Sequence, residues 1–165
     1  MNLLLEGALS DMPYVTDMRA VFGALPGLCV EHDWLISDLE RIWIGKDYVP
    51  GTPDQRLASH PLLISGNELE ELLSGHDIQF CWAVFSALPA GLTPEYEHEP
   101  FADGNQGFWI GSPQPQLTQA KMEIVCWDCS KTLLIGVDED LARRFKARFP
   151  QAVDLDLYNR RGKPQ

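Results

Sequence analysis

The sequence predicts an α+β fold, in which two or three helices pack on a mainly antiparallel sheet within one domain, residues 1–165. Three observations lead to this prediction. Several short runs are rich in β-branched and aromatic residues, and two amphipathic segments carry helix-boundary signals. The chain of 165 residues is also 45% hydrophobic, which suits a single buried core. The chain from about residue 160 is expected to be a partly flexible tail.

Two helices have clear ends in the sequence. Ser65 and Glu68 form a capping-box pattern, and the apolar spacing that follows ends at Gly75. The second helix is expected over 138–149, because acidic residues occupy its first turn and Pro150 follows its last. A weaker apolar periodicity predicts a third helix within Val15–Leu25.

Strands are expected where β-branched and aromatic residues cluster or where apolar and polar residues alternate. These segments are Leu28–Ile44 (one or two strands), Ile78–Leu88, Gly107–Ile110, Met122–Trp127, Thr132–Val137 and a final strand over 153–157. Residues 128–131 are typical of a hairpin connection. The proline-rich stretches Asp47–Pro61 and Pro89–Gln116 are expected to be ordered surface loops.

Charge is distributed unevenly along the chain. Residues 1–100 contain 16 Asp and Glu against 4 Lys and Arg, whereas residues 101–165 contain 8 against 9, for a net charge of -11. An acidic surface of this size repels nucleic acid and anionic lipid and attracts basic proteins. We therefore expect a basic protein partner and neither nucleic-acid nor membrane binding.

The location predicted from the sequence is the cytoplasm. No apolar run is long enough to form a membrane-spanning helix, and the first residues lack the basic segment of a signal peptide. Four cysteines are also too few for a disulfide scaffold in a chain of this length.

Cys126 and Cys129 form a CxxC pattern, which is found in redox and zinc sites. A redox CxxC begins a helix, whereas this one lies between two expected strands. A zinc site needs a second pair of ligands, and Cys29 and Cys81 are isolated from one another. We favour a hairpin with incidental cysteines, and we expect no metal and no cofactor.

The histidines offer a second kind of chemistry. His32 and His98 each have carboxylate neighbours in the sequence, which can orient an imidazole as a base. No HExxH or GxSxG motif accompanies them, so exposed histidines on an acidic surface are the preferred interpretation. We assign no catalytic residue.

Acidic residues interleaved with aromatic side chains are the strongest indication of a binding surface. Aromatic anchors surrounded by charge are typical of electrostatically steered interfaces. The candidate partner-binding residues are Glu31, Asp33, Trp34, Asp38, Glu40, Glu95, Tyr96, Glu97, Glu99, Asp103 and Trp109.

The chain resembles the small acidic immunity proteins that bacteria encode beside secreted toxins. It is also similar, mainly over residues 120–160, to small uncharacterised bacterial proteins with Cys126-Trp127-Asp128 before a hairpin, Phe149-Pro150, and the ending Asp156-Leu157-Tyr158-Asn159. Immunity proteins differ widely in fold, so this resemblance implies a class and assigns no functional residue.

Together these observations predict a non-enzymatic protein that neutralises a basic toxin by covering its active site with an acidic surface. Two alternatives stay open. One is a small hydrolase or metal-dependent enzyme that uses His32 or His98. The other is a structural or regulatory domain that forms a homodimer through exposed aromatic residues, so the chain is expected to be a monomer or a homodimer.

Overall fold

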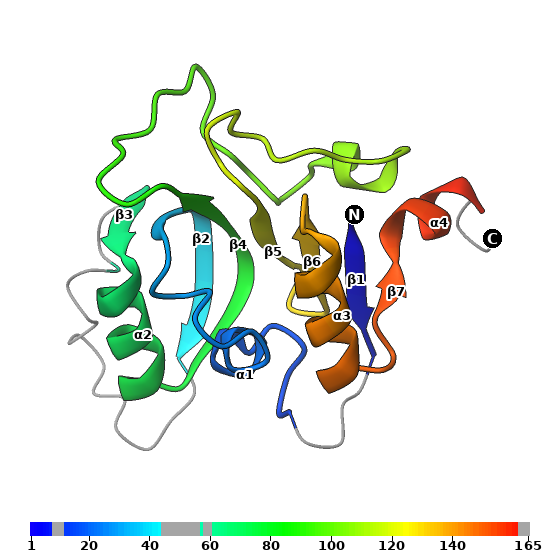
Figure 1. Ribbon diagram of the computed structural model, residues 1–165, viewed down its shortest axis with the longest axis horizontal. Helices are drawn as coiled ribbons and strands as arrows, with labels where there is room; N and C mark the ends of the chain where they lie inside the picture. Colours follow the sequence, from blue (N-terminus) through cyan, green and yellow to red (C-terminus); the bar gives the residue numbers. More distant parts are fainter. Residues whose placement is uncertain (8–11, 44–56, 58–60, 162–165) are drawn as a thin grey trace.

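A mainly antiparallel sheet organises the protein, as the sequence predicts. The computed structural model describes residues 1–7, 12–43, 57 and 61–161 (Figure 1). In this part of the chain, seven strands pair in the order β3-β2-β4-β5-β6-β1-β7, and every adjacent pair is antiparallel. The strands are β1 (Leu3–Glu6), β2 (Asp33–Trp43), β3 (Leu62–Ser65), β4 (Ile78–Leu88), β5 (Glu123–Trp127), β6 (Lys131–Ile135) and β7 (Val153–Asp154).

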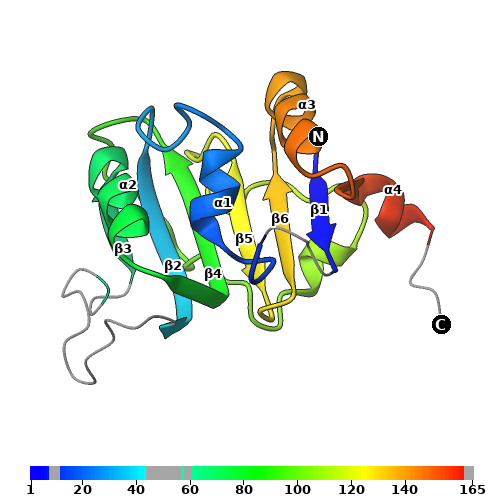
Figure 2. The same ribbon diagram turned by 90° about the horizontal axis from the view of Figure 1, so that it is seen from below.

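Three helices cover one face of this sheet: α1 (Met18–Gly23), α2 (Gly66–Gly75) and α3 (Glu139–Arg148). Their apolar faces join the inward side chains of the central strands in the main core, which includes Trp34, Phe85, Ile124, Leu134 and Phe145. We call this side of the sheet the helical face (Figure 2). The α+β architecture is therefore confirmed.

Local capping explains why the two strongest helix predictions are correct. Ser65 and Glu68 form the complete capping box, in which each side chain bonds the other residue's backbone N–H. Asp138 accepts a hydrogen bond from the N–H of Leu141, and acidic residues follow it in the first turn of α3. The weaker third pattern is also a helix, but α1 occupies only Met18–Gly23.

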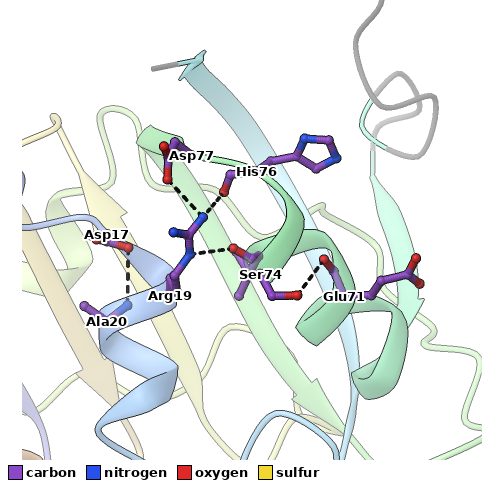
Figure 3. A network of polar contacts seen from close by, with 8 residues as sticks. Asp17, Arg19, Ala20, Glu71, Ser74, His76 and Asp77 are labelled. Carbon is purple, nitrogen blue, oxygen red and sulfur yellow. Dashed lines mark hydrogen bonds and ion pairs between the residues drawn. The ribbon is translucent and has the colours of Figure 1, made fainter. Parts of the chain in front are cut away.

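Arg19 connects α1 to the end of α2 (Figure 3). Its Nε donates to the carbonyl of Leu73 at 2.8 Å, and its Nη2 donates to the carbonyl of His76 at 2.6 Å. The same guanidinium forms an ion pair with Asp77 at 3.0 Å. Because the last carbonyls of a helix have no partner within the helix, this side chain satisfies groups that α2 leaves open.

The opposite face of the sheet is covered by the long connection between β4 and β5 and by the C-terminal segment. This connection contains the short 3-10 helix η2 (Gln106–Trp109), and the C-terminal segment contains α4 (Leu155–Arg160). A second core forms here from Leu4, Val84, Phe108, Val125 and Leu155, together with Ala102, Leu133 and Ile135. We call this side the loop face.

Glu123 of β5 fastens the long connection to the loop face. Its side chain is fully buried, and its Oε1 accepts hydrogen bonds from the N–H groups of Gln116 (2.8 Å) and Leu117 (3.2 Å) and from the hydroxyl of Ser86 (3.3 Å). Oε2 has no hydrogen-bond partner among the described residues. Burial is the main cause that raises the pKa of this carboxyl to about 7, and the hydrogen bonds oppose the rise.

Two strand predictions are wrong because local hydrogen bonds compete with the pattern. Residues 106–109 form η2, which Asn105 caps by accepting from the N–H of Gly107. The predicted last strand ends at Asp154, whose carboxylate accepts from the N–H of Leu157 and begins α4. The helix cap formed by Asp154 therefore determines the structure of this segment, although apolar and polar residues alternate along it.

Other boundaries also differ from the sequence prediction. The expected strand over Leu28–Ile44 is a single strand that begins only at Asp33, because residues 24–32 form turns. Strands β1 and β3 were not expected. Most of Asp47–Pro61 and the end of the predicted tail lie outside the described residues, whereas Pro89–Gln116 is a loop apart from η2. Within the described residues, no helix is long and apolar enough to cross a membrane.

Candidate partner-binding surface

Two acidic residues of β2 hold the long connection in place. The Oδ2 atom of Asp38 accepts hydrogen bonds from the N–H groups of Ala102 and Asp103, both at 2.7 Å. Asp33 accepts one from the N–H of Gly91, also at 2.7 Å. These two candidate binding residues therefore have a structural role that the sequence did not reveal.

The same contacts bring acidic residues from distant parts of the sequence together. The N–H of Asp38 donates to the carboxylate of Glu99 at 3.3 Å, and Asp103 follows directly on the backbone that Asp38 holds. Asp38 has a φ of 49° and lies at an irregularity in the β2–β4 pairing, with Glu40 two residues further along β2. We call Asp38, Glu40, Glu99 and Asp103 the acidic cluster.

The remaining candidate acidic residues are not part of this cluster. Glu31 lines a cavity on the helical face together with His32. Glu95 and Tyr96 line an open groove beside β3, and the side chain of Tyr96 is 39% exposed. Glu97 is exposed and makes no hydrogen bond or ion pair within the described residues.

Trp34 is not available as a partner-binding anchor. Its side chain is fully buried in the main core, where its Nε1 donates to the carbonyl of Cys29 at 2.8 Å and its ring packs on Phe22. Neighbouring positions in β2 face opposite sides of the sheet, and Trp34 points to the helical face. The prediction for this residue is wrong, because the charged neighbours in sequence are not its neighbours in space.

Trp109, by contrast, belongs to a group of partly exposed aromatic residues on the loop face. Its ring lies 5.1 Å from that of Trp127 and 6.2 Å from that of Tyr158, between centroids. Trp127 also packs on Trp82 at 5.0 Å. We call Trp82, Trp109, Trp127 and Tyr158 the aromatic surface; of these four, only Trp109 was a candidate binding residue from the sequence.

Strand register connects the aromatic surface to charged residues on both sides. Glu40 of β2 is the cross-strand neighbour of Trp82 in β4, next to the ring of Trp127 in β5. On the other side Trp127 pairs with Lys131 of β6, which pairs with Glu6 of β1. The ammonium group of Lys131 lies 3.5 Å from the carboxylate of Glu6. Directly paired residues lie on the same face of the sheet. These side chains therefore form one row on the loop face that crosses five strands, from Glu40 through Trp82, Trp127 and Lys131 to Glu6.

The cysteines are arranged differently from the sequence interpretation. Cys129 forms a disulfide with Cys81, whereas Cys126 is buried in the main core. Burial raises the pKa of the Cys126 thiol, the opposite of what a redox-active CxxC requires. The hairpin prediction is confirmed. Cys129 is not incidental, however, because its disulfide with Cys81 cross-links β4 to the β5–β6 turn.

His32 is the histidine with the most defined surroundings. It is 7% exposed, its Nδ1 lies 3.1 Å from the carbonyl of Leu28, and it lines a cavity of about 160 Å³ with charged residues that include Lys121 and Arg144. Because a carbonyl only accepts, Nδ1 carries the proton and Nε2 is the acceptor in the neutral ring. The described lining of this cavity offers a base but no Ser, Thr or Cys nucleophile.

His98 is exposed and does not line this cavity. Within the described residues, no group of three His, Cys, Asp or Glu side chains could hold a metal ion.

Comparisons with known proteins do not assign this chain to a class. No protein-family model matches it, and no curated protein and no solved structure is significantly similar to it. The geometry of the loop face is therefore what supports a function.

Proposed function

We propose that this chain is a non-enzymatic binding protein that neutralises a basic partner, as immunity proteins neutralise the toxins encoded beside them. The observation that carries the proposal is the acidic cluster. Its members come from two segments about 60 residues apart (Asp38 and Glu99 are 61 apart), and hydrogen bonds of Asp38 hold the carboxylate of Glu99 and the backbone of Asp103 next to β2.

The mechanism that we propose is electrostatic steering followed by occlusion. Clustered carboxylates create a negative potential that accelerates the encounter with a positive surface. A basic toxin that acts on an anionic substrate exposes such a surface around its active site. The acidic cluster would then occupy the path of that substrate, without any chemical step in this protein.

The test uses the product of the gene next to this one as the partner. Replacing Glu40→Gln, Glu99→Gln and Asp103→Asn together should slow its association at least about tenfold at low salt, and added salt should slow the wild type similarly. Asp38 is left intact because it supports the backbone of the long connection. Stopped-flow fluorescence measures both association rates.

A matched control removes exposed acids from the other face. Glu70 on α2 and Glu139 on α3 are exposed residues of the helical face. The double variant Glu70→Gln/Glu139→Gln removes two negative charges, against three in the test variant, and should associate nearly as fast as the wild type. Equal slowing by both sets, or an association rate insensitive to salt, would contradict the proposal.

An enzyme that uses His32 is the second candidate, because the oriented imidazole lines a cavity. Metal analysis of the purified protein, together with any hydrolytic activity lost in His32→Ala and His98→Ala, tests it. A homodimer formed through the aromatic residues is tested by light scattering on the purified chain.

The proposed location is the cytoplasm, and the redox state of the Cys81–Cys129 pair in cells tests this proposal. Bonds such as Cys81–Cys129 form and persist in oxidising compartments, whereas cytosolic thiols are kept reduced. Alkylation of thiols in intact cells, followed by mass spectrometry of these two cysteines, decides between the compartments.

A further inference from the structure

The aromatic surface is a partly exposed apolar patch that lies over a buried core. Val84, Phe108 and Val125 already form a buried cluster there, while the four aromatic residues of the surface are only partly covered. The flanking side chains of Ile110 and Leu157 are 71% and 46% exposed. Partly exposed tryptophan and tyrosine side chains grouped on one face are typical of binding sites.

The rings of this surface meet edge to face rather than stacked, and Trp127 is contacted in this way by Phe108 as well as by Trp82 and Trp109. The interplanar angle between Trp82 and Trp127 is 69°, and that between Trp109 and Trp127 is 86°. A stacked pair hides one face of both rings, whereas an edge-to-face pair hides one face of a single ring. The face of an indole attracts a cation more strongly than the face of any other aromatic side chain.

The covalent structure around these rings limits their freedom before a partner arrives. Cys81, which precedes Trp82, is disulfide-bonded to Cys129, two residues after Trp127. The turn is closed by a hydrogen bond of 3.0 Å from the N–H of Ser130 to the carbonyl of Trp127. A surface that is already ordered loses less conformational entropy when it binds.

Charge decides which ligand fits. Glu40 lies across from Trp82 and belongs to the acidic cluster, and Glu6 neutralises Lys131 on the far side of Trp127. The exposed cations Arg160 and Arg161 lie at the end of α4, beyond Tyr158. A positive group is therefore favoured on the Trp82 side of the surface and disfavoured on the α4 side.

We infer that the Trp82 side of the aromatic surface receives an arginine side chain of the basic partner, with the guanidinium against Trp82, next to Trp127, and within reach of Glu40. The inference rests on the proposed function, because it names the group through which the partner is held. The planar guanidinium combines stacking on indole with hydrogen bonds to a carboxylate, which an ammonium does less well.

The experiment probes the surface without the partner. N-acetylarginine methylamide is titrated into the isotope-labelled protein up to about 50 mM, a range suited to a contact with millimolar affinity. We expect the indole N–H signals of Trp82 and Trp127 to shift and saturate. The indole N–H of Trp34 is buried and bonded to the carbonyl of Cys29, so it is an internal control that should not move.

Neutral and substituted controls separate charge from shape. The citrulline analogue has nearly the same shape without the charge and should cause no saturable shift. Glu40→Gln and Trp82→Leu should each weaken arginine binding about fivefold, which corresponds to about 1 kcal/mol at 1.4 kcal/mol per tenfold. Trp82→Phe should retain most of the binding, and Glu70→Gln should leave it unchanged.

Three outcomes would overturn the inference. They are the absence of any shift in the two indole signals, an equal response to citrulline, and self-association of the free chain that Trp82→Leu abolishes. The last outcome would assign the surface to a second copy of this chain. The proposed function fails separately, if the product of the adjacent gene does not bind while the arginine response is observed.

Discussion

The buried carboxyl of Glu123 makes the stability of this protein depend on pH in a direction that a single substitution can test. In the folded protein its pKa is raised from 4.5 to about 7, with burial as the main cause. The folded state therefore holds this proton more tightly than the unfolded chain does. Its contribution is fully present below pH 4.5, is lost as the pH rises to about 7, and does not change further above that.

The size of the effect follows from the shift. A change from 4.5 to about 7, at 1.36 kcal/mol per pKa unit, corresponds to about 3 kcal/mol. Glu123→Gln keeps an acceptor for the N–H groups of Gln116 and Leu117 and removes the ionisation. We expect the variant to match the wild type near pH 4.5 and to be more stable by about 3 kcal/mol at pH 8. In a domain of this size that raises Tm by roughly 6–12 °C.

Urea denaturation at several pH values between 4.5 and 8 measures the difference directly. Other carboxylates affect both proteins equally, so only the gap between wild type and variant is interpreted. Glu70→Gln, which replaces an exposed carboxylate, should show no such pH-dependent gap. A constant gap across the range, or a variant that is less stable at pH 8, would refute the reasoning about burial.

Two further predictions concern the contacts that order the loop face. Asp38→Ala should lower the free energy of unfolding by about 2–3 kcal/mol, because two backbone N–H groups lose their acceptor and alanine tolerates the φ of 49° poorly. Asp38→Asn should cost about 1 kcal/mol, since the amide oxygen of asparagine can accept both bonds, though more weakly than a carboxylate, and asparagine adopts this conformation; equal losses in urea denaturation would contradict this account. Reducing the Cys81–Cys129 bond, which spans 48 residues, should lower stability by up to about 4 kcal/mol. Dithiothreitol should shift the urea midpoint of the wild type but not that of Cys81→Ser/Cys129→Ser, and a wild type that does not respond would show that the bond contributes no stability.

The sequence by itself determined the elements whose signals are local. The capping box at Ser65 and Glu68 and the acidic first turn after Asp138 act within a few residues, so α2 and α3 could be predicted closely. The apolar and β-branched runs of β4, β5 and β6 are long enough to be recognised, and so is the turn that joins β5 to β6. From these elements the antiparallel α+β class followed.

Short strands depend on their partners and could not be predicted in the same way. Strand β1 has four residues, and β3 also has four. Each is extended because it pairs with a neighbour distant in sequence, Leu4 with Leu133 and Leu63 with Leu35. Such pairing depends on long-range contacts, for which a four-residue pattern carries little information.

The candidate site was predicted only in part, for a related reason. Composition identified acidic segments, and Trp109 is partly exposed on the loop face, while its role in binding stays a prediction. Which side of the sheet a side chain faces depends on where the strand begins and on its irregularities, so Trp34 was assigned to the surface although it is buried, and Trp82 and Trp127 were overlooked.

Tertiary structure alone decided which distant groups meet. The contact of Asp38 with Glu99 and Asp103, the pairing of Cys81 with Cys129, and the packing of Trp82 on Trp127 each join residues more than 40 positions apart. The sequence determined that this protein is acidic and rich in aromatic residues. The register of the sheet and the path of the long connection placed those charges beside those rings, because only a folded backbone fixes distances between remote side chains.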